Sequence, residues 1–173
     1  MLVIRATGFV LPALLAIAGC GFELRGWDLE SSIESVHVTA QPRVRLAGEL
    51  RRALGQAGVR IEPRASRAEM TVELLDERRG RRTVAVTGSA RAAEYEVSIT
   101  VRFAVRSGAR VLREPVWLDA SRVFVVDRDN IAGTAGEQAL IEAELANDLV
   151  GQIMRALNAA AASAAPAGSA GAG

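Results

Sequence analysis

Residues 95–105, Tyr-Glu-Val-Ser-Ile-Thr-Val-Arg-Phe-Ala-Val, decide the fold of this chain. Every second residue in this stretch is apolar: Tyr95, Val97, Ile99, Val101, Phe103 and Val105. An alternation with a period of two is the pattern of a β-strand that buries one face. Burial of these side chains contributes roughly 9 to 18 kcal/mol before conformational entropy is subtracted. A slip of one residue would turn the apolar face to water, so the pairing register is strongly specified.

Further strands are predicted on both sides of this segment. A turn at Ser107-Gly108 leads to a strand over Val116 to Val126, and Met70 to Leu74 alternates as another strand. Between these, Asp76 to Arg82 contains a glycine and predicts a turn or loop. The strands are joined by short connections, which favours antiparallel pairing.

Two amphipathic helices are predicted to flank the strands in sequence. The first covers Arg43 to Ala57 and is followed by Gly58, a residue that commonly ends helices. Its apolar face consists of Leu46, Leu50, Leu54 and Ala57. The second covers Glu137 to Leu157, with an apolar residue at every fourth position: Ile141, Leu145, Leu149, Ile153 and Leu157.

The order of these elements predicts the fold class. A first strand over Ser35 to Thr39 precedes the first helix, so the order is strand, helix, several strands and helix. This order favours an α+β two-layer sandwich, in which a mostly antiparallel four- to five-stranded sheet carries both amphipathic helices on one face.

The N-terminus has the three zones of a secretory signal peptide over residues 1–19. A short start with Arg5 precedes an apolar stretch from Gly8 to Ile17, and small residues precede Cys20. The residues Ile-Ala-Gly-Cys, 17–20, resemble the bacterial lipobox, in which the cysteine is acylated and becomes the first residue of the mature chain. The alternative is an ordinary signal peptide with a chance cysteine.

Cys20 is the only cysteine, so it cannot form an internal disulfide. An exported chain then has a free thiol, an intermolecular bridge or a modified residue at this position. Acylation predicts a lipid anchor, because two or more acyl chains hold a protein stably on a membrane. Gly21 follows the cysteine in place of an aspartate, which by resemblance to other lipoproteins favours passage to the outer membrane.

The remaining chain divides into one domain and a tail. Residues 20–157 have the length of a single domain that can bury a core. Residues 158–173 are almost wholly Ala, Gly, Ser and Pro, and they predict a disordered tail. The formal net charge of +1 gives no general attraction to nucleic acid.

The residues offer little material for an enzyme, a cofactor or a metal site. His37 is the only histidine and lies within a predicted strand, which favours a structural or surface role. With one histidine and one cysteine, a zinc site lacks ligands. No nucleophile elbow or phosphate-binding glycine loop occurs. The carboxylates Asp127 and Asp129 fall in a predicted turn, where a solvated role is favoured.

All basic residues are arginine, which a GC-rich genome or a need for bidentate anion contacts would explain. Four of them cluster at Arg78, Arg79, Arg81 and Arg82, beside Asp76 and Glu77. One interpretation is a solvated hairpin tip, and the other is a surface for phosphorylated or anionic lipid. Arg91 and Arg122 lie near the ends of predicted strands and could join that surface.

Four short motifs occur in a fixed order along the chain. They are Cys20-Gly21-Phe22-Glu23-Leu24-Arg25, Ala93-Glu94-Tyr95, Arg122-Val123-Phe124 and Glu137-Gln138. With this order and the lipobox, the chain resembles the LPS-assembly lipoprotein family, LptE, over nearly the whole mature domain. The resemblance implies a sheet with two helices packed on it, and a lipid-anchored, non-enzymatic protein on the periplasmic side of the outer membrane.

The resemblance also implies partners. Family members plug the lumen of a large outer-membrane β-barrel, LptD, help it to assemble and act with it to insert lipopolysaccharide into the outer leaflet. Lipopolysaccharide itself is a proposed ligand. The other functions considered are an auxiliary lipoprotein of an ABC-type lipid transport system, an envelope enzyme and a structural lipoprotein such as a secretin pilot.

The chain departs from the family in its basic residues. In relatives, basic residues before the Ala-Glu-Tyr strand and in the loop before the last helix are implicated in lipid contact. Here the second stretch, Ile131 to Gly136, contains none. The hypothesis that follows is that phosphate contacts come from Arg82, Arg91, Arg122 and Arg128.

Overall fold

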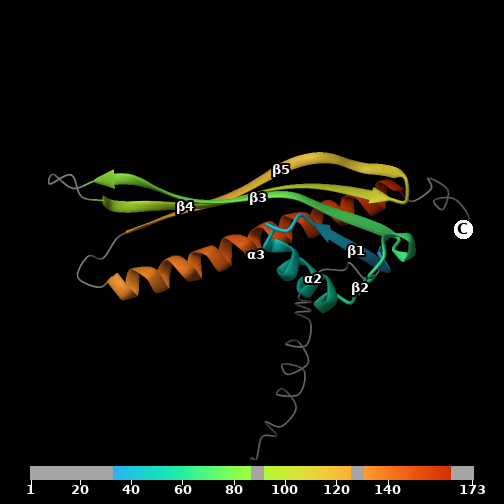
Figure 1. The fold of residues 1–173 in the computed structure, drawn as a ribbon, viewed down its shortest axis with the longest axis horizontal. Coiled ribbons are helices and arrows are strands. Elements are labelled where there is room, and N and C mark those ends of the chain that lie inside the picture. The colour runs from blue at the N-terminus through green and yellow to red at the C-terminus, as the bar shows by residue number, and fades with distance from the viewer. Residues whose placement is uncertain (1–32, 87–91, 126–130, 165–173) are drawn as a thin grey trace, which may run out of the picture.

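The structure is a computed structural model that describes residues 33–86, 92–125 and 131–164 (Figure 1). Its elements are β1 (Ser35–Ala40), α2 (Leu46–Gln56), β2 (Arg60–Ile61), the 3-10 helix η2 (Ala65–Arg67), β3 (Met70–Val86), β4 (Ala92–Ser107), β5 (Arg110–Val125) and α3 (Ile131–Ala164). Strands β3, β4 and β5 have 16 or 17 residues each, and α3 has 34. These long elements give the molecule its elongated shape.

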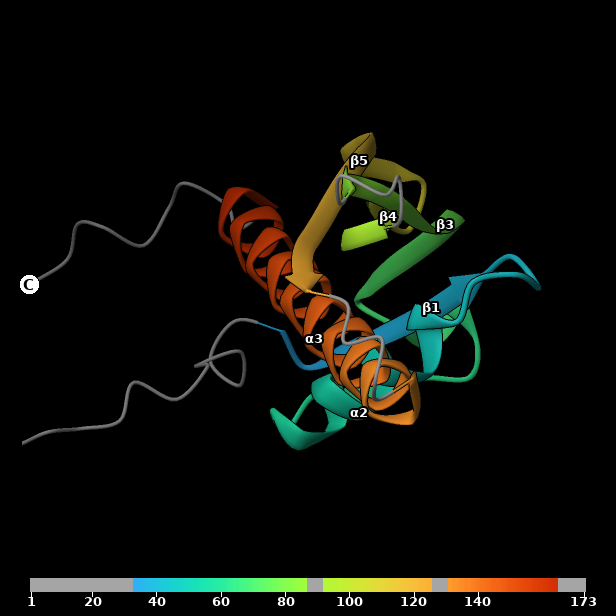
Figure 2. The same cartoon turned by 90° about the vertical axis from the view of Figure 1, so that its left-hand side faces the viewer.

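The sheet has the strand order β2-β1-β3-β4-β5. Strand β1 is parallel to β2 and β3, while β3, β4 and β5 are antiparallel. Parallel neighbours need a crossover connection, and α2 supplies it between β1 and β2. Both helices lie on the same side of the sheet (Figure 2). The predicted α+β sandwich with a mostly antiparallel sheet and two helices is therefore confirmed.

Five of the six predicted core positions of the central strand are also confirmed, and the sixth, Tyr95, is partly buried against the same core. Val97, Ile99, Val101, Phe103 and Val105 of β4 are at most 2 % exposed. The helices bury Leu46, Leu50 and Leu54 of α2 and Leu145, Leu149, Ile153 and Leu157 of α3 against this face. Gly58 follows α2 with a φ of 80°, a conformation that glycine adopts without strain and that ends the helix as predicted.

The prediction of a turn over Asp76 to Arg82 is wrong. These residues lie within β3, which pairs with β4 from Thr71 to Val86. Gly80 is opposite Ser98, whose Oγ would lie 3.2 Å from a Cβ at that position. Gly80 therefore takes part in the strand pairing, at a position where the Ser98 side chain lies close to the backbone. Pairing with the long β4 outweighs the local sequence preference for a turn.

Both ends of the second helix differ from the prediction. The helix begins at Ile131, so the expected loop from Ile131 to Gly136 is helical. It continues to Ala164, past the expected end at Leu157, so residues 158–164 are helical where a tail was expected. Alanine is the best helix former, and Ala160 and Ala161 are buried against the core.

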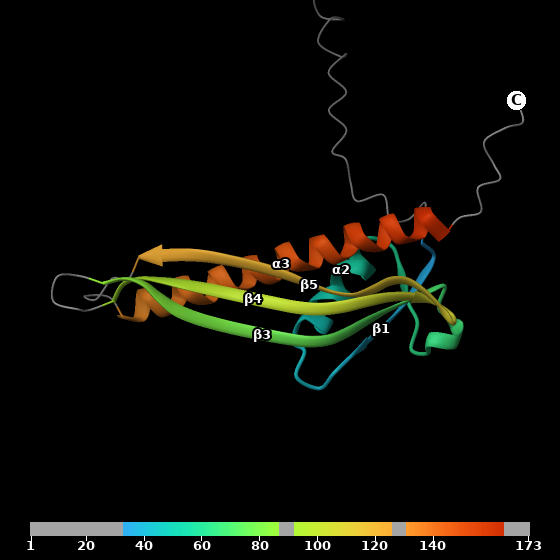
Figure 3. The same ribbon diagram turned by 90° about the horizontal axis from the view of Figure 1, so that it is seen from above.

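Strand β1 pairs with β3 only as far as Leu74, so the three long strands extend beyond β1 and α2 (Figure 3). We define the distal arm as this extension together with the first part of α3. Its members are residues 76–86 of β3, 92–103 of β4, 116–125 of β5 and 131–144 of α3. One face of its sheet is turned toward α3, and no helix in the described part of the chain covers the other face.

Candidate functional site

The arginine cluster of β3 is divided between the two faces of the distal arm. Successive side chains of a strand point to opposite faces. Arg79 and Arg81 are opposite Ile99 and Val97, which are buried on the side of α3. Arg78 and Arg82 are opposite Thr100 and Glu96 on the helix-free side. The four guanidinium groups therefore do not form a single basic surface.

The two arginines on the helix side attach α3 to the sheet. Arg79 Nε lies 2.6 Å from Glu77 Oε1, and its Nη1 lies 3.9 Å from Glu142 Oε2 of α3. Arg81 Nη1 donates a hydrogen bond to Gln138 Oε1 of α3 at 2.9 Å. These contacts surround a cavity of about 210 Å³ between β3 and α3. Because both guanidinium groups are engaged within the protein, their principal effect is to position α3.

On the helix-free side, two arginines stack on one indole. The Arg78 guanidinium carbon lies 4.5 Å from the centre of the Trp117 ring, and that of Arg102 lies 6.0 Å from it. Trp117 is still 39 % exposed. Arg78 also contacts Asp76 at 3.2 Å. Cation–π contacts of this kind are worth roughly 0.5–1 kcal/mol at exposed sites.

Farther along the same face, Arg82 forms an ion pair with Glu96 of β4. Ser121 of β5 donates a hydrogen bond to the other carboxylate oxygen of Glu96 at 3.2 Å. The hydrogen bond from Arg82, with its charge and the bond from Ser121, holds the pKa of Glu96 below that of a free glutamate. This cross-strand contact joins all three strands of the distal arm.

Of the four arginines proposed for phosphate contact, the structure describes two, Arg82 and Arg122. Arg122 of β5 is opposite Val97, so it lies on the helix side, where it forms an ion pair with Glu144 of α3. Arg82 lies on the helix-free side, so these two residues do not meet on one face. Arg91 and Arg128 lie outside the described residues, as does Cys20.

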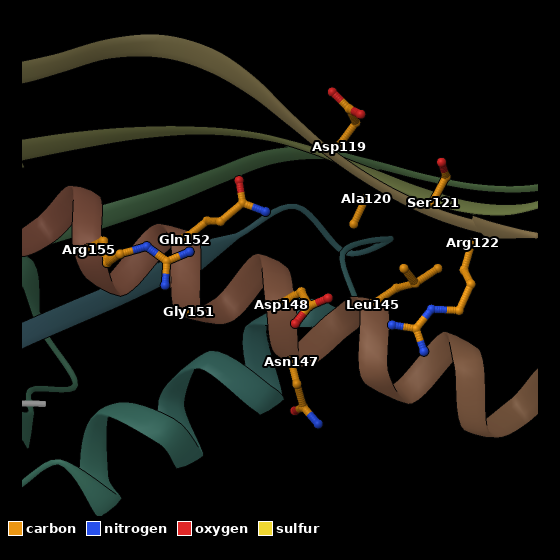
Figure 4. A pocket seen from close by; sticks show the side chains of 10 residues that line it. All are labelled: Asp119, Ala120, Ser121, Arg122, Leu145, Asn147, Asp148, Gly151, Gln152 and Arg155. Atoms are coloured by element: carbon orange, nitrogen blue, oxygen red, sulfur yellow. The ribbon is translucent and has the colours of Figure 1, made fainter. Parts of the chain in front are cut away.

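A groove separates β5 from α3 (Figure 4). Its volume is about 410 Å³, and it is lined by residues 119–122 of β5 and by residues of α3 between Leu145 and Arg155. Ala120 points toward the helix, while the Asp119 side chain points away from it. The small residues Ala120 and Gly151 line this groove and leave the space between strand and helix unfilled.

The histidine and the carboxylates give no metal site in the described ranges. No three His, Cys, Asp or Glu side chains there are close enough to hold a metal ion. His37 Nδ1 lies 2.8 Å from the backbone oxygen of Glu62, which ties β1 to the residue after β2. Asp127 and Asp129 lie outside the described residues. Within residues 33–164, as far as they are described, no helix has the length and hydrophobicity of a membrane span.

Sequence reasoning did not identify the groove, the stacking on Trp117 or the attachment of α3 by Arg79 and Arg81. A period of two applied to residues 78–82 would have separated the cluster into two pairs. The groove and the stacking depend on pairings between distant residues, which the sequence pattern does not contain.

One protein-family model matches this chain. A family model described as "LptE: Lipopolysaccharide-assembly" matches residues 33–157. Comparison with curated protein sequences gives no match.

Among solved structures, the chain is similar to uncharacterized lipoprotein B from Nitrosomonas europaea, with 23% identity and a TM-score of 0.67 over 80% of this chain and 91% of that one. Rare lipoprotein B from Shewanella oneidensis has 20% identity and a TM-score of 0.62 over 71% of this chain and 92% of its own. A minor lipoprotein from Acinetobacter baumannii has 19% identity and a TM-score of 0.59 over 73% and 92%, respectively. These likenesses show the fold.

Proposed function

This chain belongs to the LptE family of lipopolysaccharide-assembly proteins, and we propose that it is an outer-membrane lipoprotein that plugs and helps to assemble an LptD-like β-barrel. In this proposal Cys20 carries the lipid anchor and the domain lies on the periplasmic side. It acts without catalysis in the transport and insertion of lipopolysaccharide. The family match over residues 33–157 is the observation that carries the proposal.

The surface of the distal arm supports a position inside a polar lumen. Its helix-free face has exposed Arg78 and Arg82, and the opposite side has exposed Glu144 of α3. The interior of a large outer-membrane barrel is polar, while its outer wall faces lipid. An elongated body with charged side chains on both faces is compatible with that interior and would be poorly solvated by hydrocarbon.

The proposal also includes direct contact between this chain and lipopolysaccharide. We assign it to Arg82, Arg91, Arg122 and Arg128, because guanidinium groups bind phosphate in bidentate fashion. Arg82 is well exposed, with 73 % of its side chain accessible, and Arg122 has 49 % accessible. Each has an ion-pair partner at the surface, and exposed pairs are weak enough to exchange for a phosphate.

The decisive experiment for the plug is co-purification. The tagged, full-length protein is isolated from detergent-solubilised outer membranes, and the proteins that accompany it are identified by mass. A large β-barrel in a one-to-one ratio is the expected result. Recovery of an inner-membrane or periplasm-spanning transport complex would replace the proposal with the auxiliary-transport alternative.

The arginine assignment has its own test. Replacing all four arginines with glutamine should weaken lipopolysaccharide binding by at least about tenfold, and the loss should shrink as salt is raised. A matched variant replaces four exposed arginines on the other side of the molecule, Arg43, Arg52, Arg64 and Arg67, with glutamine. Equal affinity of the two variants would refute the assignment, because both lose the same net charge.

A further inference from the structure

Helix α3 is packed on the sheet along only part of its length. Its later turns bury Leu149, Ile153 and Leu157 completely. None of the side chains described in residues 133–140 is buried, and Ile141, at 7 % exposed, is the first that is. We define the helix tip as residues 133–140. Tertiary packing of an apolar face is the main source of helix stability in proteins, so the helix tip lacks the interaction that holds the rest of α3.

The sequence of the helix tip also weakens the helix. Gly133 and Gly136 lie within it, and only proline is a poorer helix former than glycine. Packing does not require a glycine at the second position, because nothing lies within 4 Å of a Cβ built at Gly136. Leu140 is 70 % exposed, so it gains little from lying beside the sheet. A short helical segment with this composition and no buried face is marginally stable in water.

A cavity separates the helix tip from β3. Its volume is about 210 Å³, and it is lined by residues 79–81 of β3, Val97 of β4 and the α3 residues Gln138 and Glu142. Atoms that face a cavity lose the contacts that close packing would supply. The helix tip lies at the end of the distal arm farthest from α2 (Figure 1), so α2 does not support it.

Arg81 holds the helix tip across this cavity. Its guanidinium carbon lies 4.5 Å from the centre of the Tyr95 ring, and its Nη1 donates a hydrogen bond to Gln138 Oε1 at 2.9 Å. Gln138 in turn donates a hydrogen bond to Glu142 Oε1, one turn farther along α3, at 2.8 Å. Such polar contacts have a small net effect in water, because water replaces them when they break. They can therefore open while the core from Ile141 onward stays packed.

We infer that the helix tip unwinds and leaves the sheet as a separate unit in the free protein, while α3 from Ile141 onward stays in place, and that the contact between Arg81 and Gln138 controls this opening. Opening is inexpensive, because none of the side chains described in the helix tip leaves a buried position. Enclosure by the barrel partner would remove water from the contact, strengthen it and close the helix tip. Only this closure rests on the proposed function.

Hydrogen exchange of the free full-length protein tests the opening. Amides of residues 137–140 donate to carbonyl groups of residues 133–136 within the helix tip. They should exchange at least about tenfold faster than the amides of residues 149–157, which open only with the core. Equal rates in the two stretches would overturn the inference, because the whole helix would then open together.

An arginine variant tests the control by Arg81. Arg81→Ala should raise the exchange rate of residues 137–140 at least about threefold, through loss of one charged hydrogen bond, and should leave residues 149–157 unchanged. The matched control is Arg78→Ala, which removes an arginine from the same strand on the helix-free side. It should change neither stretch, and equal effects of the two variants would overturn the inference.

A glycine variant tests whether the helix tip unwinds. Gly136→Ala should slow the exchange of residues 137–140 about fivefold, because alanine favours the helix and meets no neighbour at this position. The control is Gly48→Ala in α2, where a Cβ also has nothing within 4 Å. This control should leave the helix tip unchanged. An unchanged rate in Gly136→Ala would overturn the inference.

Exchange in the purified complex separates the inference from the proposed function. With the barrel bound, residues 137–140 should exchange at least about tenfold more slowly than in the free protein. If the barrel co-purifies and these amides stay fast, closure by the partner is wrong and the plug proposal stands. If no barrel co-purifies, the proposed function and the closure fail together, while the opening is still decided by the free protein.

Discussion

Glu77 connects β3 to α2 directly and to α3 through Arg79, and its replacement gives the sharpest test of how the distal arm is held. One of its carboxylate oxygens accepts the backbone N–H of Leu46 at the start of α2 at 2.8 Å, where Arg45 gives no side-chain cap. The other lies 2.6 Å from Arg79, which also reaches Glu142 of α3 at 3.9 Å. The Glu77 side chain is only 2 % exposed.

The variant Glu77→Ala removes the helix cap and the nearest partner of the Arg79 guanidinium. Loss of a cap costs about 1 kcal/mol. Loss of a largely buried charged hydrogen bond costs about 1 to 3 kcal/mol, and the lower part of this range, about 1 to 2 kcal/mol, applies here because Arg79 keeps some solvent and Glu142. The free energy of unfolding should therefore fall by about 2 to 3 kcal/mol, which lowers the Tm by roughly 8 to 12 °C for a domain of this size.

Urea titration and thermal melting, both followed by circular dichroism, measure this loss. Glu77→Gln is the control, because its amide oxygen can still accept the N–H of Leu46 while the charge is lost. We expect this variant to lose about half as much stability as the alanine variant. A Tm within about 2 °C of the unchanged protein for Glu77→Ala would refute the reasoning.

Three other predictions concern the core, a turn and a pH dependence. Leu149→Ala leaves a cavity beneath the sheet and should cost about 2 to 5 kcal/mol in urea titration. Gly108→Ala places a side chain at a φ of 54° and should cost about 1 kcal/mol, measured as a lower Tm. Because Arg82 lowers the pKa of Glu96, their contact stabilises the fold above the pKa of a free glutamate, and this contribution is lost as pH falls through the lowered pKa. Glu96→Gln should therefore melt below the unchanged protein at neutral pH, and the gap should close in strong acid.

The sheet and the helix faces could be predicted because their patterns depend on local spacing. Alternation over residues 95–105 identified both the strand and its buried face, and the structure places Val97 and Ile99 there. The four-residue spacing of Leu145 and Leu149 likewise identified the face that α3 buries. In each case the residues that share a face are close in sequence, so the period alone defines the face.

The arrangement of the arginines could not be predicted in the same way. Residues 76–82 contain charges and a glycine, which locally indicate a turn. Their extended conformation comes from pairing with β4, in which Gly80 is opposite Ser98. Arg122 meets Glu144 only because α3 runs beside β5, and residues so far apart in sequence give no signal when only one sequence is read.

The first part of α3 is attached differently from the rest of the helix, and this difference bears on where the distal arm functions. None of the side chains described in residues 133–140 is buried, whereas burial begins at Ile141. Contacts such as Arg81 with Gln138 and Arg122 with Glu144 hold this part to the sheet. Exposed polar contacts contribute little in water, because water and salt screen them. The same contacts become stronger where protein excludes water and lowers the effective dielectric constant. In the proposed function, enclosure by a barrel partner would therefore stabilise the arm in its present form.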